Sequence, residues 1–317
     1  MLYRETGIEA FYQKAVDFLR ILIETRSPRY RDFCWGYPFD WVTQKGTIAK
    51  DTPLITTTPY VYEAFEIVHS IDKNARWLSI MRSIAEHAMK DIEDFPISSE
   101  MASAGYFPGD PSGGVINASA YRAFLLAQAS RQFGDEDYWK RAERNLNFVL
   151  HAQQSNGSWK YAADGSRDFV DHFHTCFVLK ALAKIEKSTG HRGCQRAIAS
   201  GIRFYLKELF DPKGLPKPFF KAPRLTVYRN ELYDIAECIN IGVLLRGRFE
   251  ELDRIIRHVI NDLLRRWQTK DGSFRSRKLI LGWDNVPMHR WGQSQIFRSL
   301  GLFLESQTAR DNSWNRR

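Results

Sequence analysis

The sequence contains few cysteines, and their spacing matches no redox or metal-binding motif. The four cysteines form no CxxC pair and no metal-finger pattern; they are Cys34, Cys176, Cys194 and Cys238. Scattered single cysteines are typical of reduced thiols in a cytosolic protein. We therefore expect a cytoplasmic protein that binds no metal and needs no cofactor.

Long hydrophobic runs are also missing. No stretch of 18 apolar residues occurs, so the sequence predicts no transmembrane segment. The N-terminal residues include Glu5, Glu9 and Lys14, whereas a secretory signal needs an uninterrupted apolar core. Hydrophobic residues at 44% and charged residues at 26% lie near globular averages, which argues against a disordered or low-complexity chain.

Common nucleotide-binding and hydrolase signatures are absent. The sequence holds no Walker loop, no GxGxxG and no GxSxG, so nothing supports nucleotide hydrolysis or serine-hydrolase chemistry. The net charge is +9, but the basic residues are spread out and form no nucleic-acid motif, so we expect no nucleic-acid partner. An anionic carbohydrate substrate would explain the charge. Peripheral association with a membrane or a biosynthetic complex is the alternative explanation.

Internal repetition is the main feature that the sequence does have. One unit is a helix ending in glutamine, followed by a glycine turn and an aromatic residue. Gln153 and Trp159 have counterparts 115 residues later, in Gln268 and Phe274. A degenerate copy lies between them, at residues 204–219. The turn glycines of the three copies indicate a period of 57–58 residues, which is typical of a repeat architecture.

A second series of helices runs in phase with the first. Its members are apolar on most sides, as expected for helices buried between others; they begin near Pro59, Asn117, His172, Glu231 and His289. The helices between them carry their charges on one face, which suits an outer ring; they span residues 7–24, 75–94, 135–153, 193–210 and 249–268. Alternating Val/Ile/Thr runs are lacking, so no extended sheet is expected.

The two series together predict an all-α fold. We expect an α/α toroid, or barrel, of about five to six helical hairpins with inner and outer rings. The last inner helix can then pack beside the first outer helix and close the ring. The toroid forms a single domain at residues 1–307, followed by a flexible basic tail at 308–317.

The repeat resembles a known motif. The segment that carries Phe148, Gln153, Gly157 and Trp159 looks like the Q-W repeat of class II terpene cyclases, and protein prenyltransferase β subunits share similar toroids. The resemblance implies an isoprenoid-binding transferase or cyclase as one reading. However, the D-x-D-D acid motif of those cyclases is absent, and the Asp and Cys one helical turn apart at 234 and 238 have no companion ligand for zinc.

A second resemblance is to the α/α-barrel domains of enzymes that act on uronic acids. These are glucuronyl C5-epimerases, toroidal polysaccharide lyases and bacterial polysaccharide-biosynthesis proteins of that shape. The segments that prompt it span residues 35–41, 56–65, 158–175 and 282–295. The resemblance implies a uronic-acid-containing poly- or oligosaccharide and an epimerase, lyase or glycoside hydrolase. A non-catalytic toroid that binds glycan or protein is the remaining alternative.

Candidate site residues gather at the predicted starts of the inner helices, which ring one end of a toroid. The catalytic candidates are His172, His174, Asp40, Glu63, Tyr228 and Arg290. The substrate-binding candidates are Trp35, Tyr37, Trp41, Tyr60, Asn117, Tyr121, Arg122, Trp159, Trp283, Asp284 and Trp291. Aromatic rings suit stacking on sugars, and polar neighbours suit hydroxyls and carboxylates.

The residue types allow two kinds of chemistry. Asp40 and Glu63 could form the acid/base pair of a glycosidase. Proton abstraction next to a uronate carboxylate would need three groups. The candidates are His174, His172 or Tyr228 as base; Arg290, Arg122 or Asn117 facing the carboxylate; and Tyr60 or Tyr121 as acid. Each residue also has a structural reading: histidines as caps or wall residues, carboxylates as partners of arginines, and aromatics as core.

The most specific prediction concerns the first and last loops. If the ring closes, Trp35, Trp41, Trp283 and Trp291 lie at the same rim and form an aromatic cleft. Three polar residues would flank this cleft, and the two histidines at 172 and 174 would face it across the cavity; the three are Asp40, Asp284 and Arg290. The alternative is that the two loops latch the ring and bury these indoles against each other.

Overall fold

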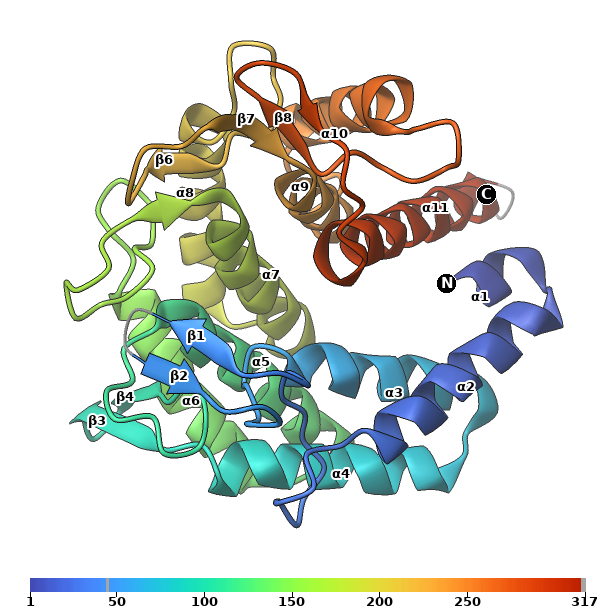
Figure 1. The fold of residues 1–317 in the computed structure, drawn as a ribbon. Helices are drawn as coiled ribbons and strands as arrows, with labels where there is room; N and C mark the ends of the chain where they lie inside the picture. The colour runs from blue at the N-terminus through green and yellow to red at the C-terminus, as the bar shows by residue number, and fades with distance from the viewer. Residues whose placement is uncertain (44–45, 315–317) are drawn as a thin grey trace.

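The protein is an all-α toroid, as the repeat predicts. The computed structural model describes residues 1–43 and 46–314. The outer helices are α2 (Glu9–Glu24), α4 (Ala75–Lys90), α6 (Glu136–His151), α8 (Arg192–Glu208) and α10 (Glu250–Asp262). The inner helices are α3 (Thr58–Asp72), α5 (Ile116–Phe133), α7 (His172–Thr189), α9 (Leu232–Leu244) and α11 (Ser294–Trp314). Figure 1 shows the two sets alternating around a central axis.

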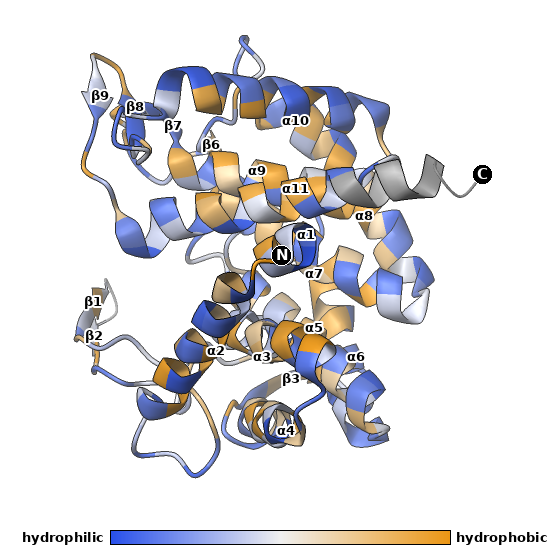
Figure 2. Ribbon diagram, turned by 90° about the vertical axis from the view of Figure 1, so that its right-hand side faces the viewer, coloured by the Kyte–Doolittle hydropathy of each residue, from blue (hydrophilic) through white to orange (hydrophobic). Residues whose placement is uncertain are grey.

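The burial of the two sets explains their placement. Most side chains of α5, α7 and α9 are buried, whereas α10 buries only Leu252, Ile256 and Val259. In Figure 2, α9 is coloured mostly as hydrophobic and α10 mostly as hydrophilic. An inner helix packs on both neighbours and on its outer partner, so an apolar surface on most sides is stabilised there.

Glycine and aspartate caps set the ends of several helices. Gly134 and Gly190 adopt left-handed φ values of 68° and 69° after α5 and α7, a conformation that costs glycine least. Asp135 caps α6 by accepting a hydrogen bond from the backbone N–H of Asp137. Each cap satisfies a group that the helix itself leaves unpaired.

The glutamine turn fastens one hairpin to the next. The Gln153 side chain donates to the carbonyls of Gly157 (3.0 Å) and of Ala197 (2.9 Å) on α8. The Trp159 indole N–H donates to the Val149 carbonyl at 2.9 Å, and its ring is buried. The repeat is therefore a structural device that joins successive outer helices.

Short strands fill the loops before the inner helices. The pairs are β1 (Trp41–Thr43) with β2 (Gly46–Ile48), β3 (Asp94–Ser98) with β4 (Met101–Ala104), and β5 (Val170–Asp171) with β6 (Phe219–Lys221). A three-stranded antiparallel sheet contains β7 (Tyr228–Glu231), β8 (Arg277–Leu279) and β9 (Trp283–Asp284). In Figure 2, β1, β2, β8 and β9 lie at the same end of the toroid. This end is the mouth of the central cavity.

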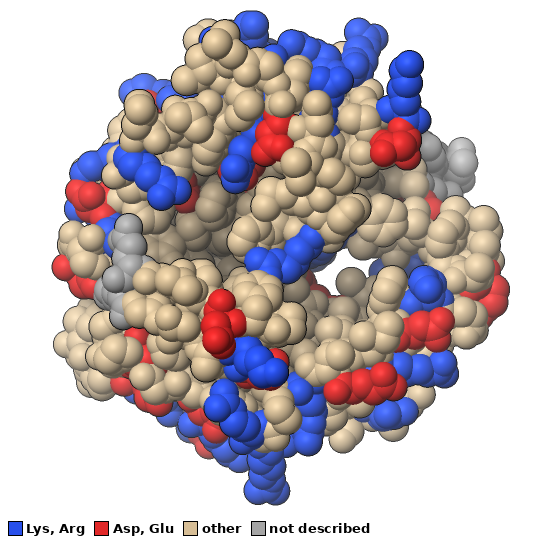
Figure 3. All heavy atoms as spheres, in the orientation of Figure 1, with Lys and Arg blue, Asp and Glu red and all other residues tan. Residues whose placement is uncertain are grey.

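The ring closes at its two chain ends. Helix α1 (Leu2–Thr6) packs against α11 and α2, and Arg4 forms an ion pair with Glu305 at 3.2 Å. Two π-helical turns, η1 (Leu263–Trp267) and η2 (His289–Gln293), adjoin α10 and α11. Figure 3 shows an opening through the molecule, which lies between α11 and α3 in Figure 1. Helix α11 runs to Trp314 and so includes part of the predicted tail, whose residues 315–317 lie outside the described residues.

Candidate functional site

The start of α7 brings a histidine and an aspartate together at the cavity mouth. Asp171 caps the helix, because its Oδ1 accepts from the backbone N–H of His174 at 3.1 Å. Its Oδ2 lies 2.6 Å from Nδ1 of the same histidine. A carboxylate at Nδ1 favours the tautomer with the proton on that nitrogen, which leaves Nε2 as a proton acceptor. This arrangement is that of a histidine oriented as a general base.

The other histidine of the His-x-His segment has a different environment. His172 is fully buried, and its Nε2 lies 2.8 Å from the Tyr205 hydroxyl. Burial lowers the pKa of His172 to about 3, so the ring is neutral. His172 supports the wall between α7 and α8, whereas the side chain of His174 keeps 20% of its surface exposed.

Aromatic rings surround His174. The nearest are Phe173 at 4.3 Å, Tyr161 at 4.6 Å and Phe177 at 5.5 Å between ring centroids. Tyr233 of α9 packs against Phe173 at 5.3 Å. Figure 3 shows this end of the molecule hollowed at its centre. Faces of aromatic rings around a polar base suit a sugar, which presents apolar C–H faces and polar hydroxyls.

Tyrosine hydroxyls continue the lining below the mouth. The Tyr60 and Tyr121 hydroxyls are 2.8 Å apart, and Tyr106 hydrogen-bonds with Thr56 at 3.2 Å. Burial raises the pKa of Tyr121 and of Tyr106 well above the usual range. Tyr106 and Tyr121 are therefore neutral, and their hydroxyls serve as hydrogen-bond donors.

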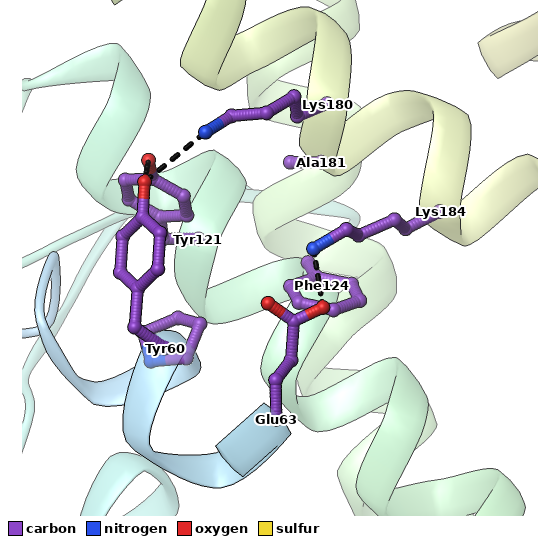
Figure 4. Close-up of a pocket in the computed structure, with 8 residues that line it drawn as sticks. Tyr60, Glu63, Tyr121, Phe124, Lys180, Ala181 and Lys184 are labelled. Atoms are coloured by element: carbon purple, nitrogen blue, oxygen red, sulfur yellow. Dashed lines mark hydrogen bonds and ion pairs between the residues drawn. The ribbon is translucent and has the colours of Figure 1, made fainter. Parts of the chain in front are cut away.

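Charged side chains from four inner helices form the cavity floor. Lys180 pairs with Glu237 at 2.5 Å and donates to the Tyr60 hydroxyl at 3.1 Å. Lys184 pairs with Glu63, and Arg298 lies 3.4 Å from the other oxygen of the same carboxylate. Figure 4 shows Lys184 and Glu63 directed toward each other beside Phe124.

The ion pairs fix the protonation of the floor. Burial opposes ionisation of Glu63, but Lys184 and Arg298 outweigh it and lower the pKa of this carboxyl. Burial likewise opposes the charge of Lys180, but Glu237 raises its pKa. Burial lowers the pKa of Lys184, and Glu63 opposes that shift. Glu63 is thus an ionised partner of two cations rather than a proton donor.

The first and last loops meet at the rim, as predicted. The Arg290 guanidinium lies over the rings of Tyr37 (4.7 Å), Phe39 (4.7 Å) and Trp291 (4.4 Å). Trp41 packs edge-on against Tyr37 at 5.6 Å. Cation–π contacts of this kind stabilise the loop pair.

The four tryptophans do not form one cleft. Trp35 is buried, donates to the Leu22 carbonyl at 2.7 Å and packs on Phe65. Trp283 packs edge-on against Trp267 at 5.0 Å. Of the four indoles, only Trp41 and Trp291 are linked at the rim: Arg290 lies over Trp291 and over Tyr37, against which Trp41 packs.

Several other candidates serve the scaffold or lie outside the cavity. Asp40 lies on an exposed loop and accepts a hydrogen bond from the backbone N–H of Lys50 at 2.8 Å. It therefore does not form the predicted acid/base pair with Glu63 on the cavity floor. Asp284 accepts from the Val286 N–H at 3.0 Å within a turn. Tyr228 lies under the Arg277 guanidinium at 4.9 Å. The remaining three are buried in the framework: Asn117, Arg122 and Trp159.

Arg122 shows why residue type alone misplaces a site. Its Nε donates to the Ala88 carbonyl at 2.8 Å, its Nη2 donates to the Ile92 carbonyl at 2.8 Å, and its Nη1 pairs with Asp94. The side chain therefore points outward from α5 to the end of α4. The sequence did not single out the cations that face the cavity; their signal is the occurrence of Lys180 and Lys184 four residues apart in the otherwise apolar stretch 176–185.

A buried acid near the Asp171–His174 pair gives a testable pH effect. Asp234 is fully buried and neither carboxyl oxygen has a hydrogen-bond partner. Burial, with added repulsion from Glu231 and Asp171, raises its pKa well above the usual range. The folded state therefore keeps a proton that the unfolded chain releases above the ordinary aspartate pKa. Asp234 consequently makes the protein less stable as the pH rises from the ordinary aspartate pKa toward the raised pKa of the folded state.

We expect Asp234→Asn to remove that loss. The variant should melt at a higher temperature than the natural chain at pH 7. The difference should shrink toward pH 3, where Asp234 is protonated in both the folded and the unfolded chain. Thermal unfolding followed by circular dichroism at the two pH values checks this. A larger gain at pH 3 than at pH 7 would contradict the assignment of a buried neutral acid.

The described part of the chain shows neither a metal cluster nor a membrane helix. Within it, no group of three or more His, Cys, Asp or Glu side chains is placed to hold a metal ion. None of its helices combines the length and the hydropathy needed to cross a bilayer.

Comparison with known proteins identifies the fold. No family model matches the sequence, and no curated protein is similar to it. Among solved structures, the cellobiose 2-epimerase of Spirochaeta thermophila superposes with a TM-score of 0.70 at 14% identity, over 95% of this chain and 84% of that one. The unsaturated glucuronyl hydrolase of Bacillus sp. GL1 gives 0.66 at 16% identity, over 94% and 81%.

A third similar structure is a polysaccharide lyase, with a TM-score of 0.66 at 10% identity over 99% of this chain and 87% of that one. At these identities the likeness concerns the fold. The chain is an α/α toroid of the kind found in these carbohydrate enzymes, which confirms the predicted fold class.

Proposed function

We propose that the protein is a carbohydrate-active enzyme that removes the proton next to the carboxylate of a uronic-acid residue. The observation that carries the proposal is the pair of His174 and Asp171 at the mouth of an aromatic-lined cavity with a cationic floor. The similar epimerase, glucuronyl hydrolase and lyase structures support a saccharide as the substrate class.

The chemistry follows from the groups present. The Nε2 of His174 takes the proton from the carbon next to the carboxylate, and the electron pair moves onto the carboxylate. Asp171 stabilises the imidazolium that forms. A phenol hydroxyl, that of Tyr60 or Tyr161, can then return a proton to that carbon or give one to the departing glycosidic oxygen. The first outcome is epimerisation and the second is elimination.

Glycoside hydrolysis fits the site less well. It needs one protonated and one ionised carboxyl group on either side of the glycosidic bond. Glu63 and Glu237 are held as ion-pair partners of cations, and Asp234 is closed off from the cavity. An isoprenoid substrate is also disfavoured, because a hydrocarbon chain would desolvate the charged floor without replacing its hydrogen bonds.

The cellular setting is part of the proposal. The four cysteines are free and buried, which fits a reducing compartment such as the cytoplasm. Nothing in the described residues supports the peripheral membrane association that the charge left open.

The direct test is turnover on matched substrates. We expect activity on oligosaccharides that contain glucuronate, galacturonate or mannuronate, and none on the corresponding neutral oligosaccharides, with products identified by NMR. Turnover of neutral oligosaccharides alone would contradict the proposal. Binding of the acidic sugars without turnover would indicate that the protein is a non-catalytic, glycan-binding toroid.

A further inference from the structure

The cavity floor contains one more cation than carboxylates. Lys180, Lys184 and Arg298 carry three positive charges, and Glu63 and Glu237 carry two negative charges. Charges withdrawn from water are costly unless they are paired. The floor is therefore short of one negative charge.

The shortage is located at Arg298. Its Nη2 lies 3.4 Å from the Glu63 carboxylate, whereas its Nη1 is buried without a hydrogen-bond partner. The side chains of Lys184 and Glu63 keep 18% and 17% of their surface exposed, and that of Arg298 keeps 26%. These three groups consequently border open space, while Lys180 and Glu237 are almost fully enclosed.

A small void adjoins the Lys184–Glu63 ion pair. It has a volume of about 10 Å³ and is lined by Tyr60, Glu63 and Lys184 among others, as Figure 4 shows. A space of this size holds about one water. The void shows that the protein's own atoms do not fill the floor.

We propose that Lys184 and Arg298 form a subsite for the carboxylate of an acidic sugar, in which Glu63 serves as the internal counter-ion. A guanidinium presents parallel N–H donors that match a carboxylate, and the exposed part of the Arg298 side chain can offer them to a ligand. The incoming carboxylate adds the missing negative charge. This inference takes the ligand class from the proposed function.

The subsite is separate from the reacting carbon. On α7, Lys184 follows His174 by ten residues, which is a rise of about 15 Å. The lysine side chain leans back toward the helix N-terminus and recovers only part of that distance. The carboxylate bound at the floor therefore belongs to a sugar residue deeper than the one at His174, so the substrate enters with an acidic terminal residue first.

Binding measured without turnover tests this. Calorimetry and saturation-transfer NMR on the His174→Ala protein would compare D-glucuronate with D-glucose. We expect glucuronate to bind at least about tenfold more tightly, since a charge-assisted hydrogen bond contributes that much. Arg298→Gln and Lys184→Met should each remove most of this preference and leave glucose binding unchanged.

Glu63→Gln is the sharpest variant, because it should have the opposite effect. Removing the internal carboxylate leaves its two cations unneutralised, so glucuronate binding should become tighter. Weaker glucuronate binding in Glu63→Gln, or an unchanged preference in the two cation variants, would overturn the subsite. If a variant fails to fold by circular dichroism, the His174→Ala protein itself decides: added NaCl should weaken binding of glucuronate but not of glucose.

Two further arms separate the ligand chemistries and the two proposals. Glucose 6-phosphate or inorganic phosphate binding more tightly than glucuronate would assign the subsite to phosphate and overturn the carboxylate assignment. A glucuronate preference that depends on Arg298, in a protein that turns over no uronate, would sustain the subsite and reject the proposed chemistry. Uronate turnover that Arg298→Gln and Lys184→Met leave unchanged would reject the subsite and sustain the proposed chemistry.

Discussion

Replacing His174 with alanine is expected to reduce turnover of a uronic-acid oligosaccharide by about 10²–10⁴-fold, the range that a positioned general base contributes. The fold should remain, because Asp171 still caps α7 through the backbone N–H of residue 174. The ring also lies at the cavity surface with 20% of its side chain exposed. Substrate binding should change much less than turnover, since the aromatic lining and the cationic floor are intact.

The neighbouring histidine provides the matched control. His172 is buried against Tyr205 and Phe210, so His172→Ala should lower the melting temperature while the folded fraction retains its turnover number. Steady-state kinetics and thermal unfolding of the two variants separate the roles. Equal loss of turnover in both variants, or none in His174→Ala, would reject His174 as the base.

Replacing Arg122 with methionine is expected to destabilise the protein by about 3–5 kcal/mol, because the carbonyls of Ala88 and Ile92 lose a buried donor and each unsatisfied buried group costs about 1–3 kcal/mol. The Asp94 carboxylate keeps Arg141 and Arg144 as partners. The guanidinium binds carbonyls at and just after the end of α4, together with the Asp94 carboxylate, so its loss affects several groups at once. Burial lowers the pKa of Arg122 to about 10, with Asp94 opposing that shift, which leaves the side chain charged near neutral pH.

An arginine on the same helix serves as the control for that change. Arg131 is 3.9 Å from Glu66, and 61% of its side chain is exposed. Arg131→Met should cost no more than about 1 kcal/mol, as for other surface ion pairs. Urea unfolding of both variants measures the difference. A loss below about 1 kcal/mol for Arg122→Met would show that the buried network adds little to stability.

The sequence was sufficient to predict the toroid, because the fold depends on properties that repeat. The 57–58-residue period, the apolar inner helices and the capping glycines after α5 and α7 are each repeated or local. Hydrophobic periodicity reports which helices are enclosed, and this does not depend on the details of contact. The inner and outer rings observed in the structure are those that the pattern predicted.

The site could be predicted only in part, because an inner helix faces three directions. Tyr121 and Arg122 are adjacent in sequence, yet a step of about 100° around the helix turns one to the cavity and the other to the outer layer. The same holds for His174 and His172, which have the same residue type. The sequence alone does not show which side of an inner helix faces the cavity. It therefore could not favour Lys184 and Arg298 over the arginines of the loops as ligands of the substrate.

The tryptophans illustrate the same limit. Trp35 and Trp159 occur in polar, aromatic segments that suggest a binding surface, but both are buried and donate to backbone carbonyls. A large indole at a loop–helix junction stabilises the junction wherever a carbonyl is within reach. Trp41 and Trp291 are at the rim because the arginine that joins their loops lies over aromatic rings there.

The most direct test of the central claim is the fate of the proton next to the carboxylate. A uronic-acid oligosaccharide that the protein turns over would be incubated with it in D₂O, and that proton followed by NMR. We predict that deuterium replaces it, or that its signal disappears as an unsaturated product forms, and that His174→Ala prevents both. New reducing ends formed with this proton fully retained would show hydrolysis instead, and would contradict the role of His174 as a carbon-acid base.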